Sequence, residues 1–206
     1  MPLLELLATW IQNPALIVEA GGYLGIALVV FAESGVLVGI FFPGDSLLFI
    51  AGLLAASGFL SLFPLILIVI TAAILGDSVG YWFGRKVGTS LFARPDSRFF
   101  KQEYVRRTEA FYAAYGGRAI ILARFVPIVR TLTPILAGVG SMHYRTFISY
   151  NIIGGTLWGA GVTLLGYFLG SVIPNIDHYI LPITFGIIVV SFMPIAVNII
   201  RHKKDA

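Results

Sequence analysis

Lysine and arginine are both absent from positions 1–84 of this chain, and most of the side chains there are apolar. Over all 206 residues, 58% are hydrophobic and 12% are charged, whereas soluble domains carry about 25% charged residues. The sequence therefore predicts an all-α polytopic membrane protein with a single membrane domain over residues 1–206. The N-terminus lacks the basic segment and the cleavage site of a signal peptide, so we expect its apolar segments to be retained.

Most of the basic residues that follow are concentrated in one connecting region and at the C-terminus. They are Arg85, Lys86, Arg94, Arg98, Lys101, Arg106, Arg107 and Arg118, and then Arg201, Lys203 and Lys204. By the positive-inside rule, we expect both groups in the cytoplasm. Three apolar segments, 60–84, 144–171 and 179–200, are each long enough to cross about 30 Å of hydrocarbon. Because the net charge of +4 comes mainly from the connecting regions, it is no evidence for nucleic-acid binding.

Two further segments are typical of helices at a membrane surface. Residues 1–20 are rich in leucine and predict a helix at the outer interface, with Trp10 as an anchor. The cytoplasmic region 85–117 carries four aromatic residues at near-helical spacing, which are Phe100, Tyr104, Phe111 and Tyr115. Basic residues are distributed around this stripe, so we interpret the region as an amphipathic helix attracted to anionic lipid.

The apolar run over residues 22–58 is interrupted by Phe42-Pro43-Gly44-Asp45. Pro-Gly followed by Asp is typical of a turn, so we interpret the run as a re-entrant hairpin with Pro43 and Gly44 at its tip. The alternative is a full span over residues 22–42 followed by a short crossing over 44–58. Both arms are apolar on all sides, so periodicity does not distinguish the two arrangements.

A second interruption extends from Arg124 to Pro134 within the apolar segment 118–142. Proline lacks a backbone donor and clashes with the preceding turn, so we expect Pro127 and Pro134 to break any helix here. Broken backbone at membrane depth survives only where it is buried in protein or lines a wet cavity. We therefore predict a second re-entrant hairpin over 118–142, with Arg124 and Arg130 facing a partner or a pathway. Alternatively, both arginines belong to a cytoplasmic turn and reach lipid headgroups.

Two parts of the chain repeat one spacing. Gly80-Tyr81 follows Gly52 at the same interval at which Gly166-Tyr167 follows Gly138. The first unit runs into basic residues and the second does not, so the two are expected to end on opposite sides of the membrane. This pattern predicts an inverted repeat of re-entrant hairpin plus transmembrane helix, with an added C-terminal transmembrane helix. The alternative is that these small residues only allow helices to pack closely.

Four side chains are the main candidates for chemistry: Glu33 and Asp45 in the first hairpin, and Arg124 and Arg130 in the second. If the two tips meet, two carboxylates face two guanidiniums, and a guanidinium also suits phosphate. An apolar setting favours the protonated form of a carboxyl group and a nearby guanidinium favours the ionised form. Movement of the guanidinium away from the carboxyl group and back would therefore make the carboxyl group take up and release a proton. Asp45 has an alternative role as the cap of a helix that begins at Ser46.

A further acid, Asp77, lies inside the span 60–84. It either pairs with an arginine or forms a hydrogen bond with the neighbouring backbone. We interpret it as a supporting residue, together with Gly44 and the prolines Pro43, Pro127 and Pro134.

The three histidines, His143, His178 and His202, show no metal-ligand spacing. We therefore expect no metal and no cofactor.

Three motifs carry a family resemblance. They are Phe42-Pro43-Gly44-Asp45-Ser46-Leu47-Leu48, Gly76-Asp77 with Gly80-Tyr81-x-x-Gly84-Arg85, and Arg124-Phe-x-Pro-x-x-Arg130 leading to Ala137-Gly138. Together they resemble the DedA family, the bacterial branch of the VTT or SNARE-associated domain proteins. The resemblance implies an inner-membrane protein with two opposed re-entrant hairpins. It also implies that the family's functional acids correspond to Glu33 and Asp45, and its paired arginines to Arg124 and Arg130.

The family is associated with proton-dependent transport and with moving lipids, including undecaprenyl phosphate and phosphatidylethanolamine, between leaflets. We therefore expect a proton-coupled transporter or flippase for a phosphorylated lipid, in the bacterial inner membrane, with a cytoplasmic C-terminus. The alternatives are a proton-coupled cation or drug exporter, in which the two acids bind the cation, and a non-transporting scaffold. An enzyme is not expected, because no Ser/His/Asp spacing or phosphatase-like histidine motif is visible. Association into a homo-oligomer stays open.

Overall fold

The computed structural model describes residues 14–35, 44–92, 111 and 114–172, and its regular structure there is helical. The helices are α2 (Pro14–Gly35), α3 (Gly44–Ala56), α4 (Leu62–Phe92), α6 (Arg118–Ala123), α7 (Pro127–Val139) and α8 (Tyr144–Val172). Most of the expected interfacial helix over 1–20 lies outside the described residues, as do most of the region 85–117 and the last predicted span over 179–200. The tip residue Pro43 also lies outside them.

Three of the described segments are long and apolar enough to cross a membrane: Ala15–Gly35, Leu62–Val87 and Tyr144–Val172. Helices α3 and α7 are also apolar but have 13 residues each. At 1.5 Å per residue, each rises about 20 Å, which is less than the roughly 30 Å of a hydrocarbon core. Neither short helix therefore crosses a membrane by itself.

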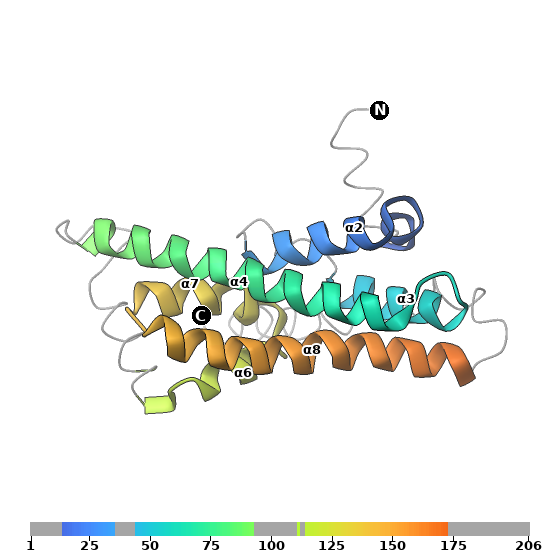
Figure 1. Ribbon diagram of the computed structural model, residues 1–206. Coiled ribbons are helices and arrows are strands. Elements are labelled where there is room, and N and C mark those ends of the chain that lie inside the picture. Colours follow the sequence, from blue (N-terminus) through green and yellow to red (C-terminus); the bar gives the residue numbers. More distant parts are fainter. Residues whose placement is uncertain (1–13, 36–43, 93–110, 112–113, 173–206) are drawn as a thin grey trace, which may run out of the picture.

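Helix α2 is kinked at Gly22, where the backbone has φ 51° and ψ −141°. Figure 1 shows the segment before this kink turning away from the rest of α2. The kink falls at the boundary that the sequence predicts between the interfacial helix over 1–20 and the hairpin that begins at residue 22. After the kink, α2 is about as long as α3. Residues 36–43, which would connect the two arms, lie outside the described residues, so the hairpin and the full span both stay predictions.

The two long helices α4 and α8 run in opposite directions through the molecule (Figure 1). Helices α2 and α3 lie toward the end where α8 finishes, and α6 and α7 lie toward the end where α4 finishes. The most extensive packing is between α3 and α8 and between α4 and α7. Helix α3 thus packs mainly on α8, and α7 packs mainly on α4, whereas the inverted repeat of hairpin plus transmembrane helix stays a prediction. Their orientation in a membrane stays a prediction.

Glycines allow these reciprocal contacts. A Cβ atom at Gly52 of α3 would lie 2.2 Å from the carbonyl oxygen of Thr163 on α8. A Cβ atom at Gly138 of α7 would lie 2.1 Å from the carbonyl oxygen of Tyr81 on α4. These two glycines are the equivalent positions of the sequence repeat. Close packing, which was the alternative explanation for the small residues, therefore occurs at the same position of both units.

The prediction that Pro134 breaks its helix is wrong. Helix α7 continues through Pro134 to Val139, whereas Pro127 occupies its first turn, where a missing N–H is tolerated. A helix-interior proline costs about 3 kcal/mol. Pro134 is buried, and a Cβ atom added at Gly80 of α4 would lie 3.4 Å from the Cβ atom of Pro134. We attribute the intact helix to this packing of α7 on α4, which offsets the missing hydrogen bond.

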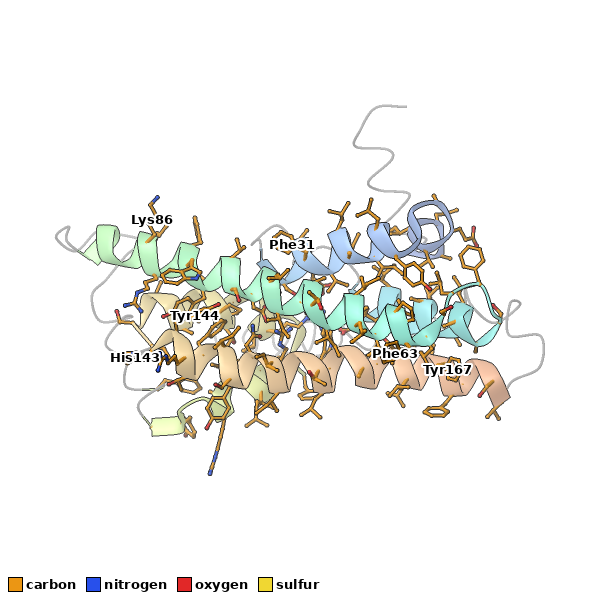
Figure 2. All side chains as sticks on the ribbon, viewed as in Figure 1. Phe31, Phe63, Lys86, His143, Tyr144 and Tyr167 are labelled. Carbon is orange, nitrogen blue, oxygen red and sulfur yellow. The ribbon has the colours of Figure 1, made fainter. Side chains whose placement is uncertain are left out.

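The two ends of the molecule differ in chemistry. Figure 2 shows Lys86 and His143 at one end, together with Tyr144, and shows Phe63 and Tyr167 toward the other end. At the first end, Tyr81 is fully buried, and its hydroxyl group accepts a hydrogen bond from Arg85 at 2.8 Å. This is the end that the positive-inside rule assigns to the cytoplasm.

Candidate functional site

Arg130 of α7 lies between two carboxylates from other helices. Its Nη1 donates to Asp45 Oδ1 at 2.6 Å, and its Nη2 donates to Glu33 Oε1. The side chains of Glu33, Arg130 and Asp45 are 4%, 9% and 24% exposed. Glu33 lies near the end of α2 and Asp45 lies in the first turn of α3. We call Glu33, Asp45 and Arg130 the Arg130 triad, which joins α2 and α3 to α7.

Gly44 makes room for the carboxylate of Glu33. A Cβ atom at this position would lie 1.5 Å from Glu33 Oε2, so any larger residue would displace the carboxylate. Among the described residues, Oε2 is buried and has no hydrogen-bond partner. An unsatisfied buried acceptor costs about 1–3 kcal/mol. This oxygen is therefore a favourable position for a proton or for a donor from a ligand.

The alternative role of Asp45 as the cap of a helix beginning at Ser46 is wrong. Helix α3 already begins at Gly44, so Asp45 lies inside its first turn, where the helix dipole favours an anion. Its Oδ1 accepts hydrogen bonds from Arg130 at 2.6 Å and from the indole Nε1 of Trp158 at 2.8 Å. Asp45 therefore connects α3 to both α7 and α8.

Trp158 of α8 is a site residue that the sequence analysis missed. It is 2% exposed, and its ring lies 4.7 Å from the guanidinium carbon of Arg130 and 5.8 Å from that of Arg124. Both distances fall within the range of cation–π attraction. A signal was present in the sequence, because tryptophan is enriched at membrane interfaces and Trp158 lies in the middle of the predicted span 144–171.

Arg124 has different partners from Arg130, although both were expected to face Glu33 and Asp45. It forms an ion pair with Asp77 of α4, and it donates a hydrogen bond to Asn151 of α8. The expectation was wrong for Arg124 because α6 packs against α8, which directs this side chain toward the two long helices. Asp77 accordingly pairs with an arginine, the first of its two suggested roles. We call Arg124, Asp77 and Asn151 the Arg124 triad.

Asn151 was also missed by the sequence analysis. It is fully buried, and its Nδ2 donates to the carbonyl oxygen of Ile74 at 3.3 Å. A polar residue inside a predicted span is a signal for a functional or structural contact.

Arg124 and Arg130 have side chains that are only 5% and 9% exposed, so neither belongs to the surface of a cytoplasmic turn.

The charges of the two triads do not cancel. They contain the carboxyl groups of Glu33, Asp45 and Asp77 and the guanidinium groups of Arg124 and Arg130. With every group ionised, one negative charge is in excess, and burial strengthens its effect. One added proton or one cation would balance the site. Within the described ranges, no group of three or more His, Cys, Asp or Glu side chains is arranged to hold a metal ion.

Comparisons with known proteins identify the family of the chain. Residues 42–168 match the VTT domain. The chain is 47% identical over 181 residues to protein DedA of Escherichia coli K12, covering 87% of this chain and 82% of that protein. It is 48% identical over 187 residues to an uncharacterized membrane protein of Mycobacterium tuberculosis H37Rv, covering 88% of this chain and 82% of that protein.

A more distant relative is the inner membrane protein YghB of Escherichia coli K12. It is 36% identical over 149 residues, which cover 72% of this chain and 68% of that protein. No solved structure matches the chain.

Proposed function

Because this chain belongs to the DedA family of VTT-domain membrane proteins, we propose that it is a proton-coupled transporter that moves a phosphorylated lipid between leaflets. Undecaprenyl phosphate and phospholipids are the substrate classes that the family resemblance implies. The observation that carries the proposal is the Arg130 triad, in which one buried guanidinium is shared by two carboxylates. The proposed partners are the lipid and protons.

A lipid phosphate would bind by exchange at Arg130. The planar guanidinium offers two parallel donors to either a carboxylate or a phosphate. The carboxylates of Glu33 and Asp45 occupy these donors, so a phosphate competes with them for the same positions. The apolar chains of the lipid would stay in the surrounding bilayer while the headgroup exchanges.

Protons would control this exchange. Protonation of Glu33 or Asp45 removes one of the two negative charges that hold Arg130, and the released side of the guanidinium then becomes available to a phosphate anion. Release of the phosphate allows the carboxylate to lose its proton and to bind Arg130 again. The buried Oε2 of Glu33, which has no partner among the described residues, supports this scheme, because burying an ionised carboxylate costs more than burying the neutral acid.

Export of a cation is the second candidate, and the excess negative charge of the two triads favours it. In that case, Glu33 and Asp45 would bind the cation directly and Arg130 would only promote its release. Catalysis is not part of the proposal, and neither is nucleic-acid binding. The two transport functions differ in their need for Arg130, which the experiment below uses.

The experiment is lipid transport by the purified protein in liposomes. A fluorescent phosphorylated lipid is placed in one leaflet, and its appearance in the other leaflet is followed with and without a proton gradient. We expect transport by the native protein to depend on the gradient, and to be lost in Arg130→Ala and Glu33→Ala. Arg145→Gln is the matched control, because this arginine is exposed at the start of α8.

Transport of the phosphorylated lipid that persists in Arg130→Ala would contradict the phosphate exchange. Proton-driven uptake of a cation by the same variant, without lipid movement, would favour the exporter. Thermal unfolding of each variant in detergent separates loss of transport from loss of folding.

The location that we propose is the bacterial inner membrane, with the C-terminus in the cytoplasm. Reporters fused after Ala206 and within residues 94–103 are then expected to be cytoplasmic, and one at Asn175–His178 is expected to be external. An external signal from residues 94–103 would contradict the orientation, because this basic region determined the assignment.

A further inference from the structure

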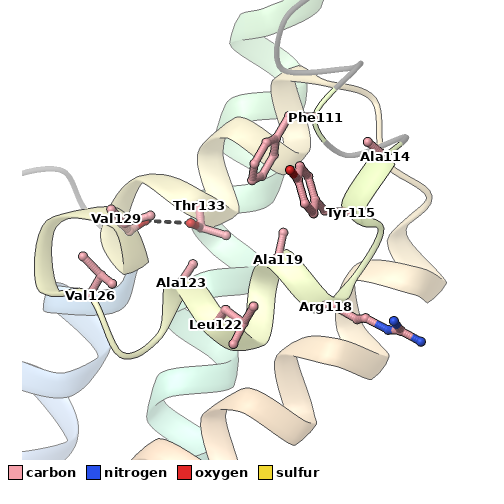
Figure 3. Close-up of a pocket in the computed structure, with 10 residues that line it drawn as sticks. All are labelled: Phe111, Ala114, Tyr115, Arg118, Ala119, Leu122, Ala123, Val126, Val129 and Thr133. Carbon is pink, nitrogen blue, oxygen red and sulfur yellow. Dashed lines mark hydrogen bonds between the residues drawn. The ribbon is translucent and has the colours of Figure 1, made fainter.

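Two apolar grooves lie on the described surface of the molecule. The α6–α7 groove has a volume of about 480 Å³ and is lined by Phe111, Ala114, Tyr115, Arg118, Ala119, Leu122, Ala123, Val126, Val129 and Thr133 (Figure 3). The α2–α4 groove has a volume of about 390 Å³ and is lined by Ala27, Leu28, Phe31, Leu67, Ile68, Thr71, Ala72 and Leu75. Both volumes fall in the range of about 300–1,000 Å³ of ligand pockets.

The walls of the two grooves are similar. Each contains one threonine whose hydroxyl group donates to a carbonyl oxygen of its own helix. Thr133 donates to Val129 in the α6–α7 groove, and Thr71 donates to Leu67 in the α2–α4 groove, both at 2.7 Å. These hydroxyl groups are satisfied within the protein and do not require a polar ligand. Both grooves therefore suit a hydrocarbon chain.

The grooves differ in charge. Arg118 is the one charged residue among those that line the α6–α7 groove, and none of the residues lining the α2–α4 groove is charged. Figure 3 shows Arg118 at one end of the α6–α7 groove and Val126 toward the opposite end. Arg118 is exposed at the first position of α6. A lipid chain lying toward Val126 would thus have its headgroup end beside a positive charge.

The α6–α7 groove is separate from the Arg130 triad. Ala123 and Val129 line the groove, whereas the residues that follow them, Arg124 and Arg130, bind partners in the interior. Successive residues of a helix point about 100° apart, so the two helices present the groove and the triads on different faces. A ligand in the groove needs no contact with Arg130.

We propose that the α6–α7 groove binds one hydrocarbon chain of an anionic membrane lipid, with the lipid headgroup at Arg118. Phe111 and Tyr115, whose ring centroids are 4.9 Å apart, form an aromatic wall of the groove. The same two residues end the aromatic stripe that the sequence predicts at the membrane surface. This site goes beyond the proposed transport, because it does not use either triad.

The experiment is photo-crosslinking of the full chain in phosphatidylcholine vesicles. One sample contains a small fraction of phosphatidylglycerol with a diazirine in one chain, and the other contains phosphatidylcholine with the same chain. Mass spectrometry measures labelling of the residues in each groove. We expect the α6–α7 groove to favour phosphatidylglycerol about fivefold, as estimated for one basic side chain at a lipid surface. The α2–α4 groove, with no charge, serves as the internal control and should show no preference.

Two pairs of variants separate the headgroup from the chain. Arg118→Gln should remove the preference for phosphatidylglycerol, and its control Arg145→Gln should retain it. Ala119→Trp should fill the groove and reduce labelling by both probes. Its control is Leu165→Trp, because Leu165 of α8 is 66% exposed and lines neither groove.

Equal preference in the two grooves, or an unchanged preference in Arg118→Gln, would overturn the proposal. So would the absence of labelling in the α6–α7 groove. Labelling in Arg130→Ala is expected to match the native protein, although lipid transport is lost. The lipid site and the proposed transport therefore succeed or fail independently.

Discussion

The two buried arginines differ in the partners that hold them. Arg124 is bound by Asp77 and Asn151, which belong to the two long helices α4 and α8. Arg130 is bound by Glu33 and Asp45, which belong to α2 and α3. The partners of Arg124 are almost completely buried, whereas Asp45 is 24% exposed and one oxygen of Glu33 has no partner among the described residues.

This difference suggests different roles for two side chains of the same type. The Arg124 triad joins α6 to both long helices and has one carboxylate for one guanidinium, which suits a fixed structural link. The Arg130 triad has two carboxylates for one guanidinium, so its members compete for the same donors and suit an exchange. Trp158 lies beside both guanidiniums and connects the two triads.

The largest expected effect is the loss of stability in Arg124→Ala. Removing one partner of a buried ion pair costs about 3–5 kcal/mol, because the other charge stays buried without compensation. We expect a clearly lower thermal midpoint in detergent. The double variant Arg124→Ala with Asp77→Ala should recover part of this loss, since it leaves no charge behind. Equal midpoints for the single and double variants would contradict a structural pair.

Arg130→Lys tests whether Arg130 acts through the two parallel donors of its planar guanidinium or only through its positive charge. Lysine keeps the positive charge but does not offer two parallel donors. Losing one charged hydrogen bond of about 1.5–3 kcal/mol corresponds to at least a tenfold decrease in lipid transport. We expect a smaller change in the thermal midpoint than for Arg124→Ala. Transport close to the native rate would show that charge alone is sufficient.

A smaller effect is expected for Asp45→Asn. The amide oxygen of asparagine still accepts hydrogen bonds from Arg130 and Trp158, but the side chain no longer takes up or releases a proton. We therefore expect partial lipid transport with a weaker dependence on the proton gradient. The measurement is the transport rate in liposomes with and without the gradient. A complete loss of transport, with the protein folded, would assign the coupling proton to Asp45 rather than to Glu33.

The smallest effect is expected for Trp158→Phe. Phenylalanine keeps an aromatic face beside Arg130 but lacks the N–H that donates to Asp45 at 2.8 Å. Loss of this hydrogen bond should lower the free energy of unfolding by about 1–2 kcal/mol and reduce transport modestly. The matched control is Trp82→Phe, because Trp82 is 53% exposed on α4. Identical effects of the two substitutions would remove Trp158 from the site.

Much of the architecture was predictable because it depends on local sequence. Apolar length identified α4 and α8, and the apolar composition, with no lysine or arginine at positions 1–84, identified a membrane protein. The break before α7 follows from Pro127, since proline favours the first turn of a helix. Glu33, Asp45, Arg124 and Arg130 were recognisable because charged residues are rare in apolar segments.

The pairing of these charges was decided only by the tertiary structure. Arg130 is 97 residues from Glu33 and 85 residues from Asp45 in the chain, so their contact depends on how α2, α3 and α7 pack. Packing of α6 on α8 likewise directed Arg124 to Asp77, and packing of α7 on α4 kept Pro134 inside a helix. The sequence by itself determined which residues are costly to place in a membrane. The tertiary structure decided which partners offset that cost, because hydrogen bonds and ion pairs require side chains to meet within a few ångströms.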